Sequence, residues 1–294
     1  MINGLIDLRS AIGYKENEQM GVIIGIDIGG STTKIVGFDS DRKIIEPMFV
    51  QANDQKTSAY GAFGKFTDTN GIKLSEIERI MITGVGSTFI GDELYSIPCE
   101  HVREFDANGR GALYLSGLKE ALVVSMGTGT AMVYATDKEI VYDGGTGVGG
   151  GTLLGLSKQM LGVSDTETLF TLAEEGDLNN IDLRIGDITK KDISPTLSAG
   201  TTAANFGNLS ELATHSDLAK GIINLVFETV GMVAVFAAKS RNIKDIVLIG
   251  SLTRNSEVER VFDTIGAMFK LRFIIPDRSR YGTAIGAALC HFEK

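Results

Sequence analysis

Tryptophan is absent from this chain, and cysteine, histidine and proline are scarce, with two, three and four residues among 294. Cys99 and Cys290 stand far apart, without the close spacing of metal ligands, so the sequence predicts reduced thiols and a cytoplasmic location. The histidines are scattered, which is more typical of structural or exposed residues than of a metal site or a catalytic triad. Chemistry that depends on clustered cysteine or histidine is therefore not expected.

Clustered positive charge and long apolar runs are also missing. The chain has 28 Lys and Arg against 37 Asp and Glu, a formal net charge of −9, and its basic residues form no run. No nucleic-acid partner is expected, because binding to phosphate backbones needs clustered basic side chains. No membrane partner is expected either, since the apolar segment 220–239 is interrupted by Glu228 and residues 1–20 mix acids with bases.

Glycine, in contrast, is abundant, with 36 residues gathered in short runs. Four glycine turns that contain hydroxyl residues each follow an apolar segment, at 27–34, 127–130, 144–152 and 250–251. Backbone N–H groups at such turns can surround phosphate oxygens, because no side chain stands in the way. One turn of this kind is more often only a turn, but four together indicate a phosphate-binding protein.

The order of the segments indicates an α/β fold with an internal repeat. Short β-branched strands alternate with helical stretches. The strand, glycine turn and strand at 22–39 recur about one hundred residues later at 121–135, as in a duplicated fold. The length suits two domains. We expect an extension at 1–20, an N-terminal domain at 21–119 and a C-terminal domain at 120–294, whose terminal helix at 283–292 is able to pack back on the first domain.

The first glycine turn carries the side chains that phosphate chemistry needs. In DIGGSTTK, at 27–34, Asp27 could hold Mg²⁺ through water, Ser31 and Thr32 offer hydroxyls, and Lys34 offers a cation. The alternative is that Asp27 is a plain edge-strand acid and Lys34 a solvated base. The spacing matches neither the P-loop nor the dinucleotide-binding fingerprint.

Several motifs resemble those of a known superfamily. DIGGSTTK (27–34), SMGTGTAM (125–132), LIGSLTRN (248–255) and TAIGAAL (283–289) are similar, in this order, to the nucleotide-binding motifs of the actin/Hsp70/sugar-kinase ATPases. From near residue 22 to its end the chain resembles the type II pantothenate kinases, through GGTGVGGGTLLGL (144–156), EEGDLNNIDL (174–183) and TAANFG (202–207). The resemblance implies two ribonuclease-H-like domains with ATP in the cleft between them.

The resemblance also implies which residues bind ATP and Mg²⁺. The metal would lie near Asp27. The residues implied around the phosphates are Asp27, Gly29, Gly30, Ser31, Thr32, Thr33 and Lys34 on one side and Gly127, Thr128, Gly129 and Thr130 on the other. The residues implied on the nucleoside side are Gly150, Gly151, Thr152, Leu153, Leu154, Gly250 and Ser251.

A catalytic carboxylate is implied about nine residues after a Thr-Gly pair. Counting from Thr83 and Gly84 gives Asp92, with Glu93 beside it, and the spacing favours Asp92. Such an acid would orient the acceptor hydroxyl and take its proton late in phosphoryl transfer. The structural alternative is an acid pair that favours the dipole at a helix start.

The activity implied is ATP-dependent phosphorylation of pantothenate to 4′-phosphopantothenate, the first step towards coenzyme A, by a homodimer. One departure bears on the substrate. The family tends to carry an Arg before the Gly-Gly pair at 144–145, whereas this chain has Tyr142 and Asp143 there. This departure favours the main alternative, a kinase of the same fold acting on another small alcohol, either pantetheine-like or a sugar.

Two further alternatives have less support. An ATPase switch like the activators of acyl-CoA dehydratases would need a local cysteine pattern for an iron–sulfur cluster, which Cys99 and Cys290 do not provide. A sugar-responsive repressor would need a DNA-binding module, for which residues 1–20 are too short.

Overall fold

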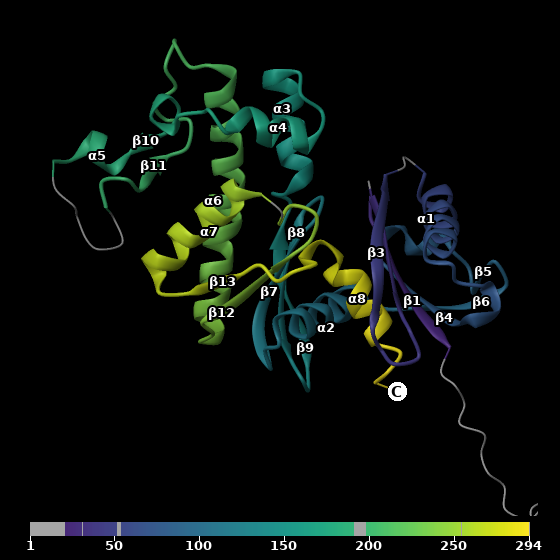
Figure 1. The fold of residues 1–294 in the computed structure, drawn as a ribbon. Helices are drawn as coiled ribbons and strands as arrows, with labels where there is room; N and C mark the ends of the chain where they lie inside the picture. The colour runs from purple at the N-terminus through teal and green to yellow at the C-terminus, as the bar shows by residue number, and fades with distance from the viewer. Residues whose placement is uncertain (1–20, 31, 52–53, 191–197, 254, 294) are drawn as a thin grey trace, which may run out of the picture.

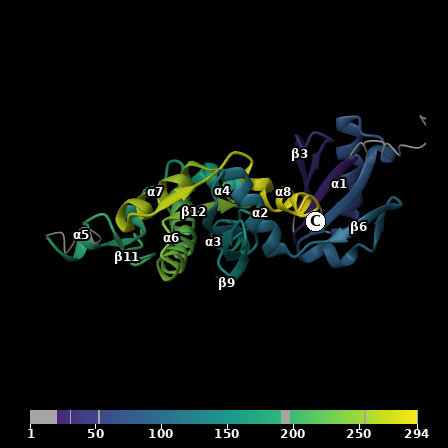
Figure 2. The ribbon, with the colours of Figure 1, turned by 90° about the horizontal axis from the view of Figure 1, so that it is seen from below.

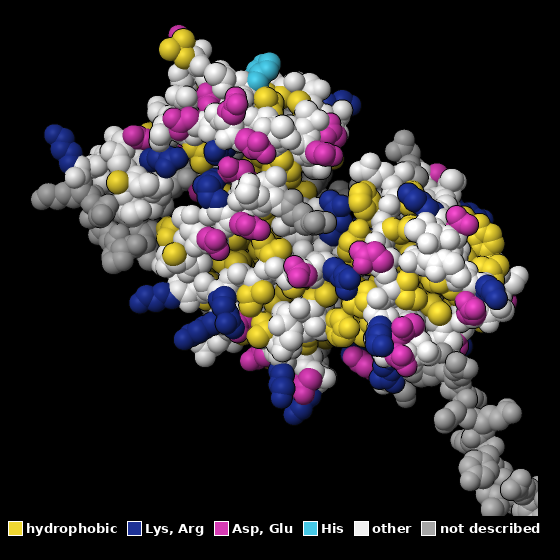
Figure 3. Space-filling model, viewed as in Figure 1, with side chains coloured by type: hydrophobic (Ala, Val, Ile, Leu, Met, Phe, Trp, Pro, Cys, Tyr) yellow, Lys and Arg dark blue, Asp and Glu magenta, His cyan; other side chains and the backbone are white. Residues whose placement is uncertain are grey.

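Two lobes, each built around one β-sheet, lie side by side in the computed structural model (Figure 1). The structure describes residues 21–30, 32–51, 54–190, 198–253 and 255–293, so the expected extension at 1–20 lies outside the described residues. On the face drawn in Figure 3, acidic and basic side chains are interspersed and a notch separates the two lobes.

The first lobe contains the N-terminal sheet, in the order β3-β2-β1-β4-β6-β5. Strands β1 to β3 are antiparallel, whereas β4 and β6 run parallel to β1. Helix α1 covers one face, where its phenylalanines pack on the isoleucines of β1 and β4. The elements are β1 (Val22–Ile28), β2 (Thr32–Phe38), β3 (Ile44–Gln51), α1 (Gln55–Asn70), β4 (Ile77–Thr83), β5 (Glu93–Leu94) and β6 (Ile97–His101).

The second lobe repeats this topology in the order β13-β12-β7-β8-β9. Here β7 to β9 are antiparallel, and β12 and β13 run parallel to β7. The repeat inferred from the glycine hairpins is thus present as two sheets of matching order. The elements are β7 (Glu120–Met126), β8 (Thr130–Thr136), β9 (Ile140–Thr146), α3 (Gly150–Leu161), α4 (Thr166–Ala173), α6 (His215–Arg241), β12 (Asp245–Ile249), α7 (Ser256–Phe269) and β13 (Arg272–Ile274).

Helices cover both faces of the second sheet. Helices α3, α4, α6 and α7 pack on one face and form the larger core of the protein, and α2 (Glu104–Ser116) packs on the other face. A small ribbon of β10 (Leu183–Arg184) and β11 (Thr202–Ala204), with the short α5 (Ile185–Ile188), projects beside α6 (Figure 1). By length and apolar composition α6 could cross a membrane, but most of its apolar stretch is already buried in this core.

Two tightly crossed helices join the lobes, as Figures 1 and 2 show. Helix α8 (Gly282–Leu289) packs on the first sheet, and α2 packs on the second. Glycines allow the contact: a Cβ added to Gly111 would lie 1.9 Å from the Gly282 carbonyl oxygen, and one added to Gly286 would lie 1.8 Å from the Ala107 carbonyl oxygen. The expected domain boundary near residue 120, between α2 and β7, stays a prediction.

Sequence patterns missed or misplaced several elements. Strand β3 was not predicted because it is a half-exposed edge strand interrupted by Glu46 and Pro47. Strand β9 was not predicted because its end, Gly144 and Gly145, was interpreted as part of a glycine turn. Helix α3 already begins at Gly150, within the glycine turn expected at 144–152.

Candidate active site

A buried ion pair marks the carboxyl end of the first strand. Asp27 and Lys34 lie opposite each other on β1 and β2, and Lys34 Nζ donates to Asp27 Oδ2 over 3.1 Å. Both residues are only 6% exposed, so they are kept from bulk water while they face the end of the sheet. A buried pair of this kind is a weak source of stability, because desolvation offsets the attraction. Its place, at the ends of β1, β2 and β4, is typical of a ligand site in an α/β sheet.

The turn after β4 leaves room for this pair only because residue 84 is glycine. Gly84 has φ +89°, and a Cβ there would lie 2.6 Å from Asp27 Oδ1 and 2.5 Å from the Ile28 carbonyl oxygen. No L-residue with a side chain fits both this backbone conformation and this space. The turn at Thr83 and Gly84 therefore helps to set the position of the Asp27 carboxylate.

The glycine turns of the two lobes face each other. A Cβ added to Gly30 would lie 3.6 Å from Thr128 Oγ1, so the turn after β1 nearly meets the turn between β7 and β8. The second turn is held by α3, since the N–H groups of Gly150 and Gly151 donate to the carbonyl oxygens of Gly127 and Thr128 over 2.9 and 2.8 Å. The structure thus brings three of the four sequence-predicted turns into one region.

The fourth turn lies beside the end of β7. Gly250 has φ +109°, and a Cβ there would lie 2.3 Å from the Met126 carbonyl oxygen. The Gly250 N–H donates to the Ser279 carbonyl oxygen over 3.0 Å, which fixes the turn from the side of α8. Ser251 follows it and is half-buried.

The remaining predicted nucleotide residues differ in what they offer to a ligand. Ser31 lies outside the described residues. The Thr33 hydroxyl is buried and accepts from Ser58 Oγ over 2.7 Å, and the Thr152 hydroxyl donates to the Gly147 carbonyl oxygen over 3.1 Å. The Leu153 side chain belongs to the buried core, so only its backbone could touch a ligand. Thr32, Leu154 and Gly29 are half-buried.

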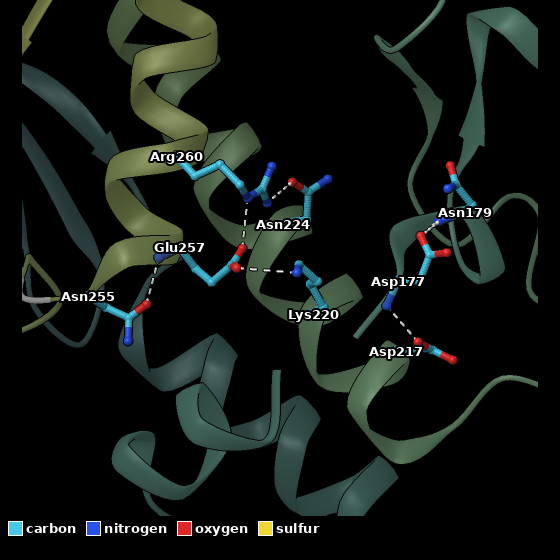
Figure 4. A network of polar contacts seen from close by, with 8 residues as sticks. All are labelled: Asp177, Asn179, Asp217, Lys220, Asn224, Asn255, Glu257 and Arg260. Atoms are coloured by element: carbon cyan, nitrogen blue, oxygen red, sulfur yellow. Dashed lines mark hydrogen bonds and ion pairs between the residues drawn. The ribbon is translucent and has the colours of Figure 1, made fainter. Parts of the chain in front are cut away.

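A polar network connects the start of α7 to α6 (Figure 4). Glu257 accepts from Lys220 Nζ over 3.3 Å and from Arg260 Nε over 2.8 Å, and Arg260 Nη2 also donates to Asn224 Oδ1 over 3.3 Å. Asn255 caps α7 by accepting from the Glu257 N–H over 2.8 Å. The network follows directly after the turn at 250–251, so it fixes the helix that this turn opens.

Glu104, which the sequence reasoning missed, approaches the ion pair from the start of α2. Burial and the nearby Asp27 carboxylate raise the pKa of Glu104, and Lys34 lowers it. These effects place Glu104 within electrostatic reach of both members of the pair. A carboxylate with a raised pKa in a partly water-excluded site is suited to act as a general base. The sequence signal for Glu104 is weak, because the strand that precedes it, Ile97–His101, contains Pro98 and Glu100.

The structure does not bring Asp92 and Glu93 to this cluster. Both are exposed and lie at the short edge strand β5, beyond β6 in the sheet order. Their charges act instead on Cys99, whose pKa burial raises to about 11, with Glu93 and Asp92 adding to the rise. The thiol of Cys99 therefore stays protonated at neutral pH.

Tyr142 and Asp143, the departure in β9, take part in two separate contacts. The Tyr142 ring stacks on Phe105, the neighbour of Glu104, with centroids 4.0 Å apart. Asp143 points to the other face of the sheet, where Arg241 at the end of α6 binds it with two hydrogen bonds. Asp143 is thus already neutralised by a cation of the same lobe.

The donor set is compatible with Mg²⁺ held together with a nucleotide. Asp27 supplies a carboxylate at this point, and Mg²⁺ characteristically takes one or two carboxylates with substrate phosphates. The described residues contain no group of three or more His, Cys, Asp or Glu side chains that would hold a metal unaided. The metal would therefore arrive with the phosphates.

Comparison with known proteins gives the context of this site. The Fumble family profile matches residues 65–270. A type II pantothenate kinase of Bacillus cereus (strain G9842) is 30% identical over 277 residues, covering 90% of this chain and 97% of that protein. A type II pantothenate kinase of Staphylococcus epidermidis is 31% identical over 246 residues, covering 81% of this chain and 88% of that protein.

Solved structures share the fold at lower identity. The activator of 2-hydroxyisocaproyl-CoA dehydratase from Clostridium difficile, with bound ADPNP, has a TM-score of 0.67 at 19% identity and covers 92% of this chain and 94% of its own. A ROK family glucokinase from Streptomyces griseus, in complex with glucose and AMPPNP, has a TM-score of 0.58 at 13% identity and covers 93% of this chain and 100% of its own. These likenesses confirm the actin-like ATPase fold, and the sequence matches show that the chain belongs to the Fumble family, together with the type II pantothenate kinases.

Proposed function

We propose that this protein transfers the γ-phosphoryl group of ATP to the primary hydroxyl of pantothenate, giving 4′-phosphopantothenate, the first step towards coenzyme A. The observation that carries the proposal is the cluster of Asp27, Lys34 and Glu104 beside the facing glycine turns. It combines a cation, a metal-binding carboxylate and a candidate base, which are the parts that phosphoryl transfer to an alcohol requires. The choice of pantothenate as the acceptor rests on the similar proteins that are named type II pantothenate kinases.

The residues would divide the work as follows. The N–H groups of Gly29 and Gly127 already donate to the carbonyl oxygens of Thr32 and Gly129. The backbone N–H groups of Gly30, Thr128 and Gly129 would therefore bind the phosphates, and Lys34 would neutralise charge on the transferred group. Glu104, near Asp27, would orient the acceptor hydroxyl and accept its proton late in the transfer. Mg²⁺, near Asp27, would supply further charge neutralisation when it is bound with ATP.

The arrangement of the lobes supports transfer to an alcohol rather than to water. The crossed helices α2 and α8 connect the two sheets, so movement there would close the turns on the substrates. Closure would exclude water from the phosphoryl group. We also propose a cytoplasmic homodimer, in line with the reduced cysteines and the resemblance to type II pantothenate kinases.

A second candidate function is phosphorylation of a different small alcohol. The Phe105–Tyr142 stack favours it, since an aromatic pair takes the place beside Glu104 where a cation was expected. An ATPase switch of the activator type has less support. Cys99 and Cys290, the chain's two cysteines, are both free thiols, one on β6 and the other after α8.

The deciding experiment is an acceptor-dependent kinase assay with the purified full chain, ATP and Mg²⁺. We expect ADP release that depends on pantothenate, and a product with the mass of 4′-phosphopantothenate. ADP release only with other alcohols would reject pantothenate as the substrate. Nucleotide binding without transfer to any acceptor would reject the kinase assignment.

A further inference from the structure

The start of α2 brings an aromatic pair to the site. Phe105 directly follows Glu104, and its ring stacks on Tyr142 of β9 with the two planes 11° apart. The pair therefore joins two elements at a point next to the proposed base. The phosphoryl-transfer steps described above leave both rings without a role.

Part of the pair is open to a ligand. Phe105 also packs against the buried apolar cluster between α2 and the second sheet, which fixes its position. Tyr142, in contrast, is 49% exposed. A Cβ added to Gly145 would lie 3.2 Å from the Tyr142 hydroxyl oxygen, so this hydroxyl lies close to the end of β9. That end of β9 pairs with Thr130, the first residue of β8. The pair thus extends from the base towards the phosphate-binding turn.

The cations on the elements that meet here are already paired. Lys34 on β2 bonds to Asp27, and Arg103, just before α2, makes two hydrogen bonds to Asp106. A third cation, Arg241 at the end of α6, is bound to Asp143 on β9, as described above. A negative charge on the acceptor, close to its reacting hydroxyl, would have to displace one of these acids to find a partner.

We propose that the Phe105–Tyr142 pair is the wall of the acceptor subsite and that it selects an alcohol whose reacting hydroxyl is flanked by apolar, uncharged carbon. The inference rests on the proposed function, because it places the acceptor between Glu104 and the phosphates. Aromatic rings bind apolar carbon well. A sugar would set several hydroxyls against rings that cannot satisfy their hydrogen bonds. Pantothenate and its uncharged amides carry two methyl groups on the carbon next to the CH₂ that bears the reacting hydroxyl, and these fit such a wall.

The test combines variants with an acceptor series. Pantothenate and panthenol share the dimethyl end and differ in charge at the far end, and glucose represents a polyhydroxylated acceptor. We expect Tyr142→Ala to raise KM for pantothenate and panthenol about tenfold, since a ring contact is lost, with KM for ATP unchanged. Tyr142→Phe should keep both KM values within about twofold, because the ring remains. Glucose should be a poor acceptor for all variants.

Tyr134 provides the matched control. It lies on β8 but on the opposite face of the same sheet, where its ring packs under Arg241 and its hydroxyl donates to Glu120 over 2.8 Å. Tyr134→Ala should leave KM for the acceptor unchanged. If Tyr142→Ala does not fold, Tyr142→Leu replaces it, because it keeps apolar volume while removing the ring.

The possible outcomes separate the two proposals. An acceptor KM that is unaffected by Tyr142→Ala, or an ATP KM that rises with it, would overturn the wall while leaving the kinase activity in place. Efficient use of glucose by the unaltered protein would also overturn it. Failure of the unaltered protein to release ADP with any acceptor of the series would reject the proposed function and, with it, this inference.

Discussion

Glu104 combines two opposing influences on one carboxyl group. Its place in the first turn of α2 favours the charged form through the helix dipole. Burial and the Asp27 carboxylate act against the charged form, and the net result is a raised pKa. A group held in this balance gives up and takes a proton more readily near neutral pH than an exposed glutamate does.

The assignment of Glu104 as base can be compared directly with the one made from spacing. We expect Glu104→Gln to lower kcat by about 10²- to 10⁴-fold, the usual contribution of a general base, with little change in ATP affinity. Asp92→Asn and Glu93→Gln serve as controls on β5 and should keep turnover within about twofold, since exposed acids away from the cluster bear little of the rate. Loss of turnover in either control, with Glu104→Gln active, would restore the assignment from spacing.

The pH profile should report the same carboxyl group. Glu104 must be ionised to accept a proton, so kcat/KM should fall as the pH drops through its pKa, which lies above the ordinary value of 4.5. Asp27→Asn removes a charge that raises this pKa and frees Lys34, which lowers it. The acidic limb of the variant should therefore move to lower pH, even though its maximal rate is reduced.

Asp68→Asn, on the exposed side of α1, is the control for this profile and should leave the acidic limb in place. An acidic limb that does not move in Asp27→Asn would mean that a group other than Glu104 controls the rate at low pH.

The course of the chain explains why the acids found by counting residues lie away from the Asp27 cluster, whereas Glu104 lies near it. After β4 the chain passes to the edge of the sheet, forms β5, and returns along β6, which is parallel to β4. The carboxyl end of β6 therefore lies beside the carboxyl end of β4, and Glu104 comes three residues after β6 ends. Recognising 97–101 as a strand would have pointed to Glu104, but that short segment contains Pro98 and Glu100 and lacks a clear strand pattern.

At the scale of single elements, the polar face of α6 binds the start of α7. Lys220 and Glu257 are both largely buried, and Glu257 also holds Arg260 (Figure 4). Removing one partner of such a network leaves an uncompensated charge in a poorly solvated place. The network therefore orients α7 even though a buried ion pair adds little stability by itself.

We expect Glu257→Gln to lower the free energy of unfolding by about 2–4 kcal/mol, somewhat less than full loss of a buried pair because the amide still accepts a hydrogen bond. Urea-induced unfolding followed by circular dichroism would measure the change. Glu259→Gln, two residues later on the exposed side of α7, should change it by less than about 0.5 kcal/mol. Equal effects of the two substitutions would contradict a structural role for the network.

Helices and strands with strong apolar patterns were predicted well, and those ending in glycine were not. The strands expected within 22–39 and 121–135 appear as β1, β2, β7 and β8, and the terminal helix expected at 283–292 appears as α8. The glycines at 144–145 pair with β8 as part of β9, although glycine is usually depleted in strands. In β9 the pairing of neighbouring strands outweighs the local preference.

At the scale of the whole molecule, the crossing of α2 and α8 connects the two halves. Gly111 and Gly286 let the backbones approach closely, and Thr283 Oγ1 donates to the buried Asn108 Oδ1 over 2.8 Å. Motif order in the sequence was enough to predict two similar sheets and the superfamily. The geometry of the crossing could not be predicted, because it depends on which glycines face each other in three dimensions.

Gly111→Ala tests the crossing. The added methyl group would overlap the Gly282 carbonyl, so the helices must separate, and we expect destabilisation of about 2–4 kcal/mol, in the range of overpacked cores and lost contacts. Gly155→Ala is the control, since a Cβ there meets nothing within 4 Å on helix α3, and it should stabilise slightly if at all. Thermal unfolding of both variants would measure the difference, and similar melting temperatures would contradict the tight crossing.

The near-contact of Gly30 and Thr128 has a consequence for the rate at which ADP leaves the site. If the phosphates lie between these two turns, nucleotide can leave only after the lobes separate about the α2–α8 crossing. The dwell time of ADP then depends on the stiffness of the two crossed helices more than on the strength of its own hydrogen bonds. A substitution that loosens the crossing would shorten that dwell time and, where product release limits the rate, make the enzyme faster as it becomes less stable.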